Sequence, residues 1–144
     1  MIDDLYSREI LRRTTQMQHV GHLERFDGAA DRTAKLCGSQ IHVEVTMAGA
    51  VITGFAQQVE ACALGQAAAA ILSQQVIGAT CDELVAARDA MRAMFRGEAF
   101  AFPERFADFA ILQSVKDFPA RHASTLLALE ATVEAAGKAM AKAG

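Results

Sequence analysis

Two cysteines, Cys37 and Cys62, have the residue type and the setting for chemistry. Each lies among small residues, Cys37 at the start of Cys-Gly-Ser and Cys62 within Ala-Cys-Ala-Leu-Gly. A thiolate is a soft, charged ligand for zinc or iron, and it is also the nucleophilic form of cysteine. The pair therefore predicts a sulfur or metal site, or the remains of one, provided that the fold brings the two thiols together.

The residues between the two cysteines predict a hairpin. Apolar and polar residues alternate over 40–47, which is the period-two pattern of a half-buried strand. Residues 48–50 have turn chemistry, and residues 51–59 are expected to form the return strand. Because a hairpin of this length returns the chain to near its start, Cys37 and Cys62 are expected at the same edge of a small sheet.

The rest of the chain is predicted to be mostly helical. The expected elements are a helix over residues 2–16, an edge strand within 23–36, the hairpin, an alanine-rich helix over 62–77, a helix over 81–95, a short helix over 104–115, and a last helix that opens at Pro119. Thr80 followed by Glu83 is a capping-box pattern. The order indicates an α+β fold, in which a small antiparallel three-stranded sheet packs against about five helices in a single domain, residues 1–144.

Helical spacing predicts which residues face the core in the two longest helices. They are Leu84, Met91, Met94 and Phe95 in the helix over 81–95, and Leu126, Leu129, Val133, Ala136 and Met140 in the last helix. Methionine and phenylalanine at this spacing are typical of a core and require no cofactor.

Composition disfavours several classes of partner. The chain has 144 residues, of which 52% are hydrophobic and 22% charged, as in a globular domain. Its net charge of -3, with no basic run longer than Arg12-Arg13, argues against nucleic acid. No apolar run reaches the length of a membrane span, and the first residues lack a signal core. We therefore expect a cytoplasmic protein with reduced cysteines and no membrane partner.

Several short motifs, taken in order, resemble the U-type iron–sulfur cluster assembly scaffolds, namely IscU, SufU and the N-terminal domain of NifU. The motifs are Leu5-Tyr6 and Ile10-Leu11, Cys37-Gly38-Ser39, Ala61-Cys62-Ala63-Leu64-Gly65 followed by small residues, Gly78-Ala79-Thr80 before Asp82-Glu83, and Pro119-Ala120-Arg121-His122-Ala123-Ser124. The long stretch between Cys62 and Ser124 is similar to the SufU subgroup. The resemblance implies an IscU/SufU-like fold and a scaffold or carrier rather than an enzyme.

The chain departs from this family at the implied metal site. In the family, three cysteines and the aspartate of Cys-Gly-Asp bind the cluster or zinc. Here Ser39 stands in place of the aspartate and Ser124 in place of the third cysteine. The resemblance therefore leaves Cys37 and Cys62 as ligands. Cys62, at the start of a helix, is also the expected sulfur acceptor, because the helix dipole favours a thiolate there.

Other residues could complete or assist this site. His122, close to the lost cysteine, is the first candidate for a further metal ligand, and His19 and His22 are others; each could equally be an ordinary surface residue. Ser39 is a further auxiliary candidate, since its hydroxyl could hydrogen-bond a thiolate. Arg121 matches the family arginine and could stabilise a thiolate or pair with a carboxylate. Cys81 lies outside the motifs and is interpreted as a helix-start residue.

Two classes of function follow. The first is a scaffold or sulfur carrier that binds iron, a transient iron–sulfur cluster or zinc, with a cysteine desulfurase and other assembly or acceptor proteins as partners. The second is a protein-interaction module for a desulfurase or another assembly factor, in which the fold is kept and the metal site has decayed. A zinc-dependent sulfurtransferase is disfavoured, because the residues that changed are its zinc ligands.

Overall fold

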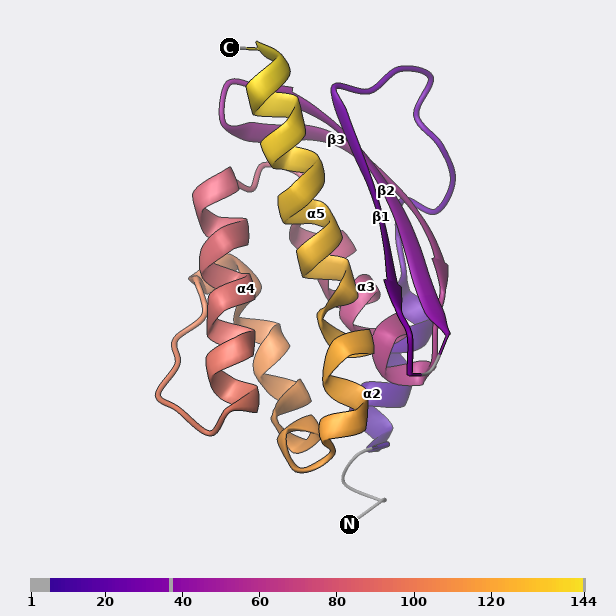
Figure 1. The fold of residues 1–144 in the computed structure, drawn as a ribbon, viewed down its shortest axis with the longest axis vertical. Helices are drawn as coiled ribbons and strands as arrows, with labels where there is room; N and C mark the ends of the chain where they lie inside the picture. Colours follow the sequence, from indigo (N-terminus) through magenta and orange to yellow (C-terminus); the bar gives the residue numbers. More distant parts are fainter. Residues whose placement is uncertain (1–5, 37, 144) are drawn as a thin grey trace.

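Three antiparallel strands form a meander in the computed structural model, which describes residues 6–36 and 38–143 (Figure 1). The strands are β1 (Gly28–Ala34), β2 (Ser39–Ala48) and β3 (Val51–Glu60), in the order β1-β2-β3. The β2–β3 pairing closes at Ala48 and Val51, so the turn is two residues long. The predicted hairpin is confirmed. The predicted edge strand within 23–36 is also confirmed, and it is the shorter strand β1.

Helices cover one face of this sheet (Figure 1). They are α2 (Arg8–Arg13), α3 (Ala63–Gln75), α4 (Cys81–Phe95) and α5 (His122–Ala143), with 3₁₀-helices η1 (Thr14–Gln16), η2 (Glu104–Asp117) and η3 (Pro119–Arg121). The predicted α+β fold is therefore confirmed. Among the described residues, no helix has the length and apolar character needed to cross a bilayer.

Three of the predicted helices differ in detail. The first was expected over residues 2–16; the described part is α2 followed by the 3₁₀ turn η1, and residues 1–5 lie outside the described residues. The segment predicted over 104–115 is the 3₁₀-helix η2, which has a non-helical residue at Phe106 and continues to Asp117. Pro119 opens η3 rather than α5 itself, because the chain makes one 3₁₀ turn before the α-helix begins.

The capping box of α4 is confirmed. The Glu83 backbone N–H donates to Thr80 Oγ1 at 3.0 Å, and the Thr80 backbone N–H donates to Glu83 Oε1 at 2.9 Å. These bonds satisfy two donors that a helix start otherwise leaves without a partner. The four core residues predicted in this helix, Leu84, Met91, Met94 and Phe95, are all buried.

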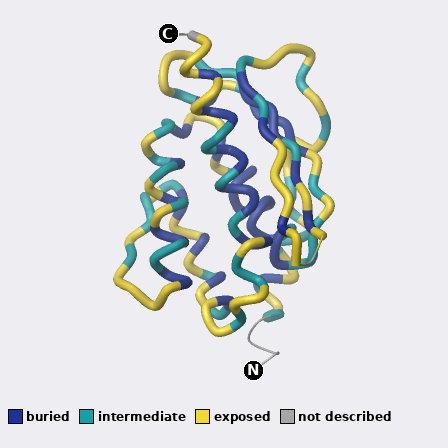
Figure 2. The backbone as a smooth tube through the Cα atoms, in the orientation of Figure 1, coloured by how far each residue is buried: buried dark blue, intermediate teal, exposed yellow. Residues whose placement is uncertain are grey.

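Helix α5 lies between the sheet and α4, and its buried face is built largely of alanine (Figures 1 and 2). Of the predicted stripe, Leu129 and Ala136 are buried and Leu126 and Val133 are half-buried. The prediction was wrong for Met140, which is 39% exposed. Ala135 and Ala139 face the core at this end of the helix instead, because small side chains let α5 approach the sheet closely.

The contact between α5 and β1 is close enough to require glycine at position 28. A Cβ built on Gly28 would overlap the Ala135 carbonyl oxygen and lie 2.8 Å from the Ala139 backbone nitrogen. Both obstacles are backbone atoms, which cannot move aside without shifting the helix. The absence of a side chain at this position therefore sets the distance between helix and sheet.

The segment between η1 and β1 runs along the sheet on the side away from α5 (Figure 1). It first pairs with β3: Val20 forms a parallel bridge with Gln57, whose backbone bonds the His19 carbonyl and the Gly21 N–H, each at 3.0 Å. It ends at Asp27, which accepts the Met47 backbone N–H through Oδ2 at 2.9 Å. Part of the outer sheet face is thereby covered.

The close contact predicts the effect of adding one methyl group. Gly28→Ala should lower the free energy of unfolding by about 3 kcal/mol, because helix and sheet would have to separate. Urea unfolding measures this change. Gly137→Ala, on the exposed side of α5 with nothing within 4 Å of the added carbon, is the matched control; it should stabilise by about 0.5–1 kcal/mol. Equal effects of the two substitutions would contradict the account.

Candidate functional site

Cys62 lies where β3 passes into α3, as the N-cap residue of that helix, and its side chain is half-buried. Its backbone N–H donates to Ser39 Oγ at 3.4 Å, and its Sγ lies 3.4 Å from Ser124 Oγ. Ser39 begins β2 and is 2% exposed, and Ser124 is in the first turn of α5 and is 1% exposed. Three segments far apart in the sequence therefore meet at one residue, Cys62, whose thiol is half-buried.

Close packing of α3 against the start of α5 makes this meeting point. A Cβ on Gly65 would lie 2.8 Å from the Ala61 Cβ and 3.2 Å from the Ser124 carbonyl oxygen. The start of α5 is fixed in turn, because the hydroxyls of Ser124 and Thr125 donate to the Arg121 carbonyl at 3.2 and 2.7 Å. Glycine at position 65 thus lets Ser124 come up to Cys62.

Two predicted site residues stay predictions. Cys37 lies outside the described residues, so its expected place beside Cys62 is untested; Ser39, two positions later, is in contact with Cys62. Arg121 is half-buried in η3; its carbonyl accepts the hydroxyls of Ser124 and Thr125, and its backbone N–H donates to the Phe118 carbonyl at 2.9 Å. A role for its guanidinium beside a thiolate therefore remains an expectation.

His122 is placed by contacts with η2 and α4. Its ring stacks on Phe95 with centroids 4.6 Å apart and an interplanar angle of 18°. Its Nε2 lies 2.9 Å from the Val115 carbonyl oxygen and 3.0 Å from that of Lys116, which makes it a donor to the end of η2. No hydrogen bond joins it to Cys62 in the described part of the chain. The structure therefore gives His122 a structural setting, and its role as a ligand remains a prediction.

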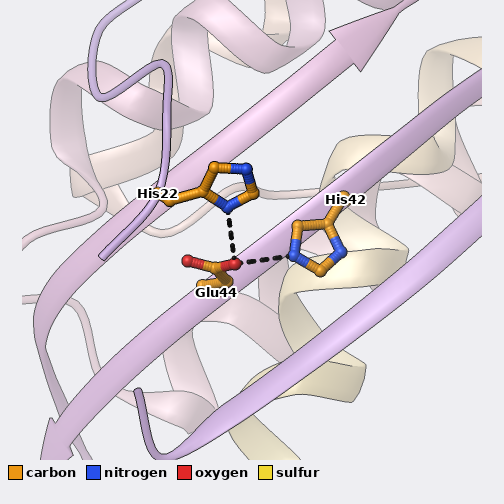
Figure 3. Close-up of side chains that lie close together, drawn as sticks. All are labelled: His22, His42 and Glu44. Carbon is orange, nitrogen blue, oxygen red and sulfur yellow. Dashed lines mark hydrogen bonds and ion pairs between the residues drawn. The ribbon is translucent and has the colours of Figure 1, made fainter. Parts of the chain in front are cut away.

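A second polar cluster lies on the outer face of the sheet, and the sequence analysis did not identify it. His22 Nδ1 and His42 Nε2 lie 2.9 and 2.8 Å from the same oxygen, Glu44 Oε2 (Figure 3). His42 and Glu44 occupy alternate positions of β2, so they project from the same face. His22 comes from the segment between η1 and β1, which covers part of the outer sheet face. His19, three residues earlier, packs edge-on against Phe55 instead.

These contacts keep the carboxyl group of Glu44 ionised. Glu44 is 4% exposed, and burial alone would raise the pKa of its carboxyl group. Hydrogen bonds from His22, the Leu23 backbone N–H and His42 outweigh burial and lower that pKa to about 2. The hydrogen bond to Glu44 in turn raises the pKa of His42, against burial, with a further contribution from Asp31.

Cys81 is the first residue of α4 and packs half-buried against the core. Burial raises the pKa of its thiol, and the neighbouring carboxylate of Asp82 adds to this. Its backbone N–H donates to the Ala50 carbonyl at 2.9 Å, which ties α4 to the hairpin turn. These contacts agree with the interpretation of Cys81 as a helix-start residue.

Comparison with known proteins decides the family. The sequence model of the NifU-like N-terminal domain matches residues 5–125, most of the chain. The chain belongs to this family. A NifU-like domain from Brucella abortus, described as a nitrogen-fixing NifU-like protein (N-terminal), is 43% identical, with 98% of each chain covered and a TM-score of 0.94. None of the curated proteins matches this NifU-like domain significantly.

A more distant solved structure shares the fold of this NifU-like domain. It is a putative iron–sulfur cluster assembly scaffold protein for the SUF system from Fervidobacterium islandicum, with 21% identity and a TM-score of 0.85. The likeness covers 93% of this chain and 98% of that one. The resemblance drawn from the motifs is confirmed at the level of family and fold.

The buried carboxylate predicts a loss of stability on neutralisation. Glu44→Gln should lower the free energy of unfolding by roughly 1–3 kcal/mol, because His22 and His42 lose their charged acceptor. Urea unfolding in the presence of a chelator measures it. Glu60→Gln is the control, since Glu60 is an exposed residue of β3 bonded to Gln40; it should change stability by less than about 0.5 kcal/mol.

The directions of the Glu44 and His42 pKa shifts determine the pH range in which Glu44→Gln lowers stability. The contribution of Glu44 is present above its unfolded pKa of about 4.5 and is lost as the pH falls towards 2. The contribution of His42 is present below its unfolded pKa of about 6.5 and is lost as the pH rises through its raised folded value. The difference between wild type and Glu44→Gln should therefore be largest between about pH 4.5 and 6.5; a difference that grows below pH 4 would contradict this.

Proposed function

We propose that this NifU-like domain is a scaffold or carrier in iron–sulfur cluster assembly, which binds iron, a transient cluster or zinc through Cys37 and Cys62. The observation that supports this most is the convergence of Cys62 with Ser39 and Ser124. These serines occupy the positions at which the resemblance implies an aspartate and a third cysteine. This arrangement around a half-buried thiol supports a site of the family kind at Cys62.

The proposed chemistry at Cys62 begins with sulfur transfer. The Cys62 thiolate attacks the outer sulfur of a persulfide on a donor protein, a new S–S bond forms at Cys62, and the donor cysteine leaves as a thiolate. The backbone N–H groups at the start of α3 favour negative charge on the acceptor. Ser124 Oγ lies 3.4 Å from the same sulfur. Its hydroxyl donates to the Arg121 carbonyl oxygen, so it would have to rotate to donate to the sulfur.

Metal binding at this site rests on the two thiolates. A serine hydroxyl keeps its proton at neutral pH, so Ser39 and Ser124 are weak replacements for a carboxylate and a thiolate. A four-coordinate site then needs further ligands. Two chains that each contribute Cys37 and Cys62 would supply four.

The partners follow from the chemistry. A sulfur carrier needs a persulfide donor, for which we propose a cysteine desulfurase, and an acceptor among other iron–sulfur assembly proteins. The proposal places this exchange in the cytoplasm, where cysteines stay reduced. The protein then acts by holding and handing over its cargo rather than as an enzyme.

Removing the thiol tests this proposal directly. Cys62→Ser should lose uptake of iron and sulfide in anaerobic reconstitution, while its melting temperature stays within a few degrees of wild type, because the thiol is only half-buried. Metal analysis and circular dichroism measure the two quantities. Cys81→Ser is the matched control and should keep full uptake. Unchanged uptake by the Cys62 variant would refute the proposal.

Restoring the family residue provides the opposite test. Ser124→Cys places a third thiol beside Cys62 and should strengthen zinc binding at least about tenfold, because a thiolate replaces a neutral hydroxyl. Competition with a chromophoric chelator measures the affinity. Thr125→Cys, one position along the helix, adds a thiol that faces elsewhere and should leave the affinity unchanged. Equal gains from both variants would show that Ser124 is not a ligand position.

One observation favours the second candidate function, an interaction module without a metal. The hydroxyls of Ser39 and Ser124 make hydrogen bonds to Cys62 and Arg121, so the site is already satisfied by protein groups. This function requires full desulfurase binding by the Cys37→Ser/Cys62→Ser double variant, together with no metal in anaerobically purified protein. Loss of desulfurase binding in that variant would count against it.

A further inference from the structure

The cluster of His22, His42 and Glu44 lies on the opposite face of β2 from the Cys62 site. Ser39, Ile41 and Val43 point into the core, so the residues between them, including His42, point away from it. The thiol site and the histidine cluster are therefore separated by the sheet, and they share none of the hydrogen bonds described.

Each member of the cluster also contacts a different residue outside the cluster. Glu44 Oε1 accepts the Leu23 backbone N–H at 2.8 Å, which leaves Oε2 to face the histidines. His42 Nδ1 lies 2.9 Å from Asp31 Oδ1 on the adjacent strand β1. This carboxylate–histidine contact is the arrangement that orients histidine ligands in metal sites and fixes their tautomer.

His22 has a comparable support on β3. Its Nε2 lies 2.7 Å from the Gln58 side-chain amide, while its Nδ1 faces Glu44. In the structure the amide nitrogen of Gln58 faces this ring, so the proton of His22 lies on Nδ1, towards Glu44. If the amide turns so that its oxygen faces the ring, Gln58 accepts a proton on Nε2 and leaves Nδ1 as the lone-pair nitrogen. His22 Nδ1 and His42 Nε2 both face Glu44 Oε2, so the three possible ligand atoms lie close together (Figure 3).

We infer that this triad, His22, His42 and Glu44, is a second metal site, which binds a zinc ion on the outer face of the sheet. Two imidazole nitrogens and one carboxylate oxygen form a donor set known from zinc sites that keep a fourth position open. On binding, the ion replaces the two protons that now lie between the imidazoles and the carboxylate; one leaves His42 Nε2 for solvent, and the other moves from His22 Nδ1 to Nε2.

The two contacts with Glu44 need only a small adjustment for this replacement. The three ligand atoms lie within 4.8 Å of one another. A tetrahedral zinc ion with bonds of about 2.0–2.2 Å separates its ligand atoms by about 3.4 Å. The contacts of 2.8 and 2.9 Å to Glu44 must therefore open by about half an ångström. His22 can make this movement, since its side chain is 59% exposed and lies on a connecting segment.

A cavity borders the triad at His42, although its lining includes neither His22 nor Glu44. This cavity of about 240 Å³ opens on this face of the sheet, and its lining includes Asp31, His42 and Gln58. The cation at its rim, Arg32, is turned towards α5, where its Nε lies 2.9 Å from Glu134. Negative charge from Asp31 and Glu44 therefore dominates beside the triad, which favours a cation.

Zinc titration of a protein without the two family thiols tests this inference apart from the proposed function. The full-length Cys37→Ser/Cys62→Ser variant, treated with chelator and then dialysed, should bind about one equivalent of zinc. Adding His22→Ala should weaken binding at least about tenfold, and adding Asp31→Asn about 10–100-fold. Zinc should also raise the melting temperature of the parent by several degrees and leave that of the His22 variant unchanged.

His19→Asn is the matched control for loss of a histidine on the same segment. His19 has a φ of 61°, which asparagine tolerates, and it lies outside the triad. The control should bind zinc as tightly as the parent, and circular dichroism without zinc should show all variants folded. No zinc bound by the parent, which lacks Cys37 and Cys62, would overturn the inference, and the cluster would then be a structural one in which two histidines share protons with Glu44. Equal binding by a His22→Ala/His42→Ala variant would also overturn the inference.

Discussion

The close approach of α5 to its neighbours is the constraint on which the candidate thiol site depends. At one end the helix meets the backbone of β1 at Gly28, and at the other it meets α3 at Gly65, in both cases with no room for a Cβ. Alanine supplies most of the packing face between these two points. Because the helix is fixed at both ends, Ser124 is brought up to Cys62, a residue 62 positions earlier. Contact between Cys62 and the start of α5 is thus a consequence of packing small residues.

The register of β2 is the second constraint, since both faces of this strand carry chemistry. The inward residues begin with Ser39, which accepts the Cys62 backbone N–H, and the outward residues include His42 and Glu44. A shift of one residue would exchange the two faces and destroy both arrangements. The pairing of Gly28 with Val45 and of Glu44 with Ala56 fixes this register from both neighbouring strands. One strand can therefore serve two sites that the sheet keeps apart.

Local signals in the sequence were sufficient for most of the fold. Alternation predicted β2 and β3, and Thr80 with Glu83 predicted the start of α4, because both patterns depend on neighbours in the chain. The buried face of α5 was predicted less well, since alanine gives little contrast between a core and a surface position. The 3₁₀ form of η2 had no local signal that we could identify.

For the candidate sites too, the sequence predicted some features and not others. The motif positions 39, 62 and 124 were found from the resemblance, and the structure brings them together. The contacts of His122 with Phe95 and η2 depend on tertiary packing and could not be predicted from sequence spacing. His42 and Glu44 did carry a signal, two positions apart on one strand face. The sequence could not show that the segment between η1 and β1, which lacks regular structure, would place His22 beside them.

The central claim is that the thiols of this NifU-like domain hold an inorganic cargo. The most direct test is the metal and acid-labile sulfide content of protein purified under strict anaerobic conditions, with the Cys37→Ser/Cys62→Ser variant purified alongside. The account predicts iron with sulfide in the wild type and neither in the variant; zinc retained by both would belong to the histidine site. Wild-type protein without iron or sulfide, or the same content in both proteins, would contradict the claim.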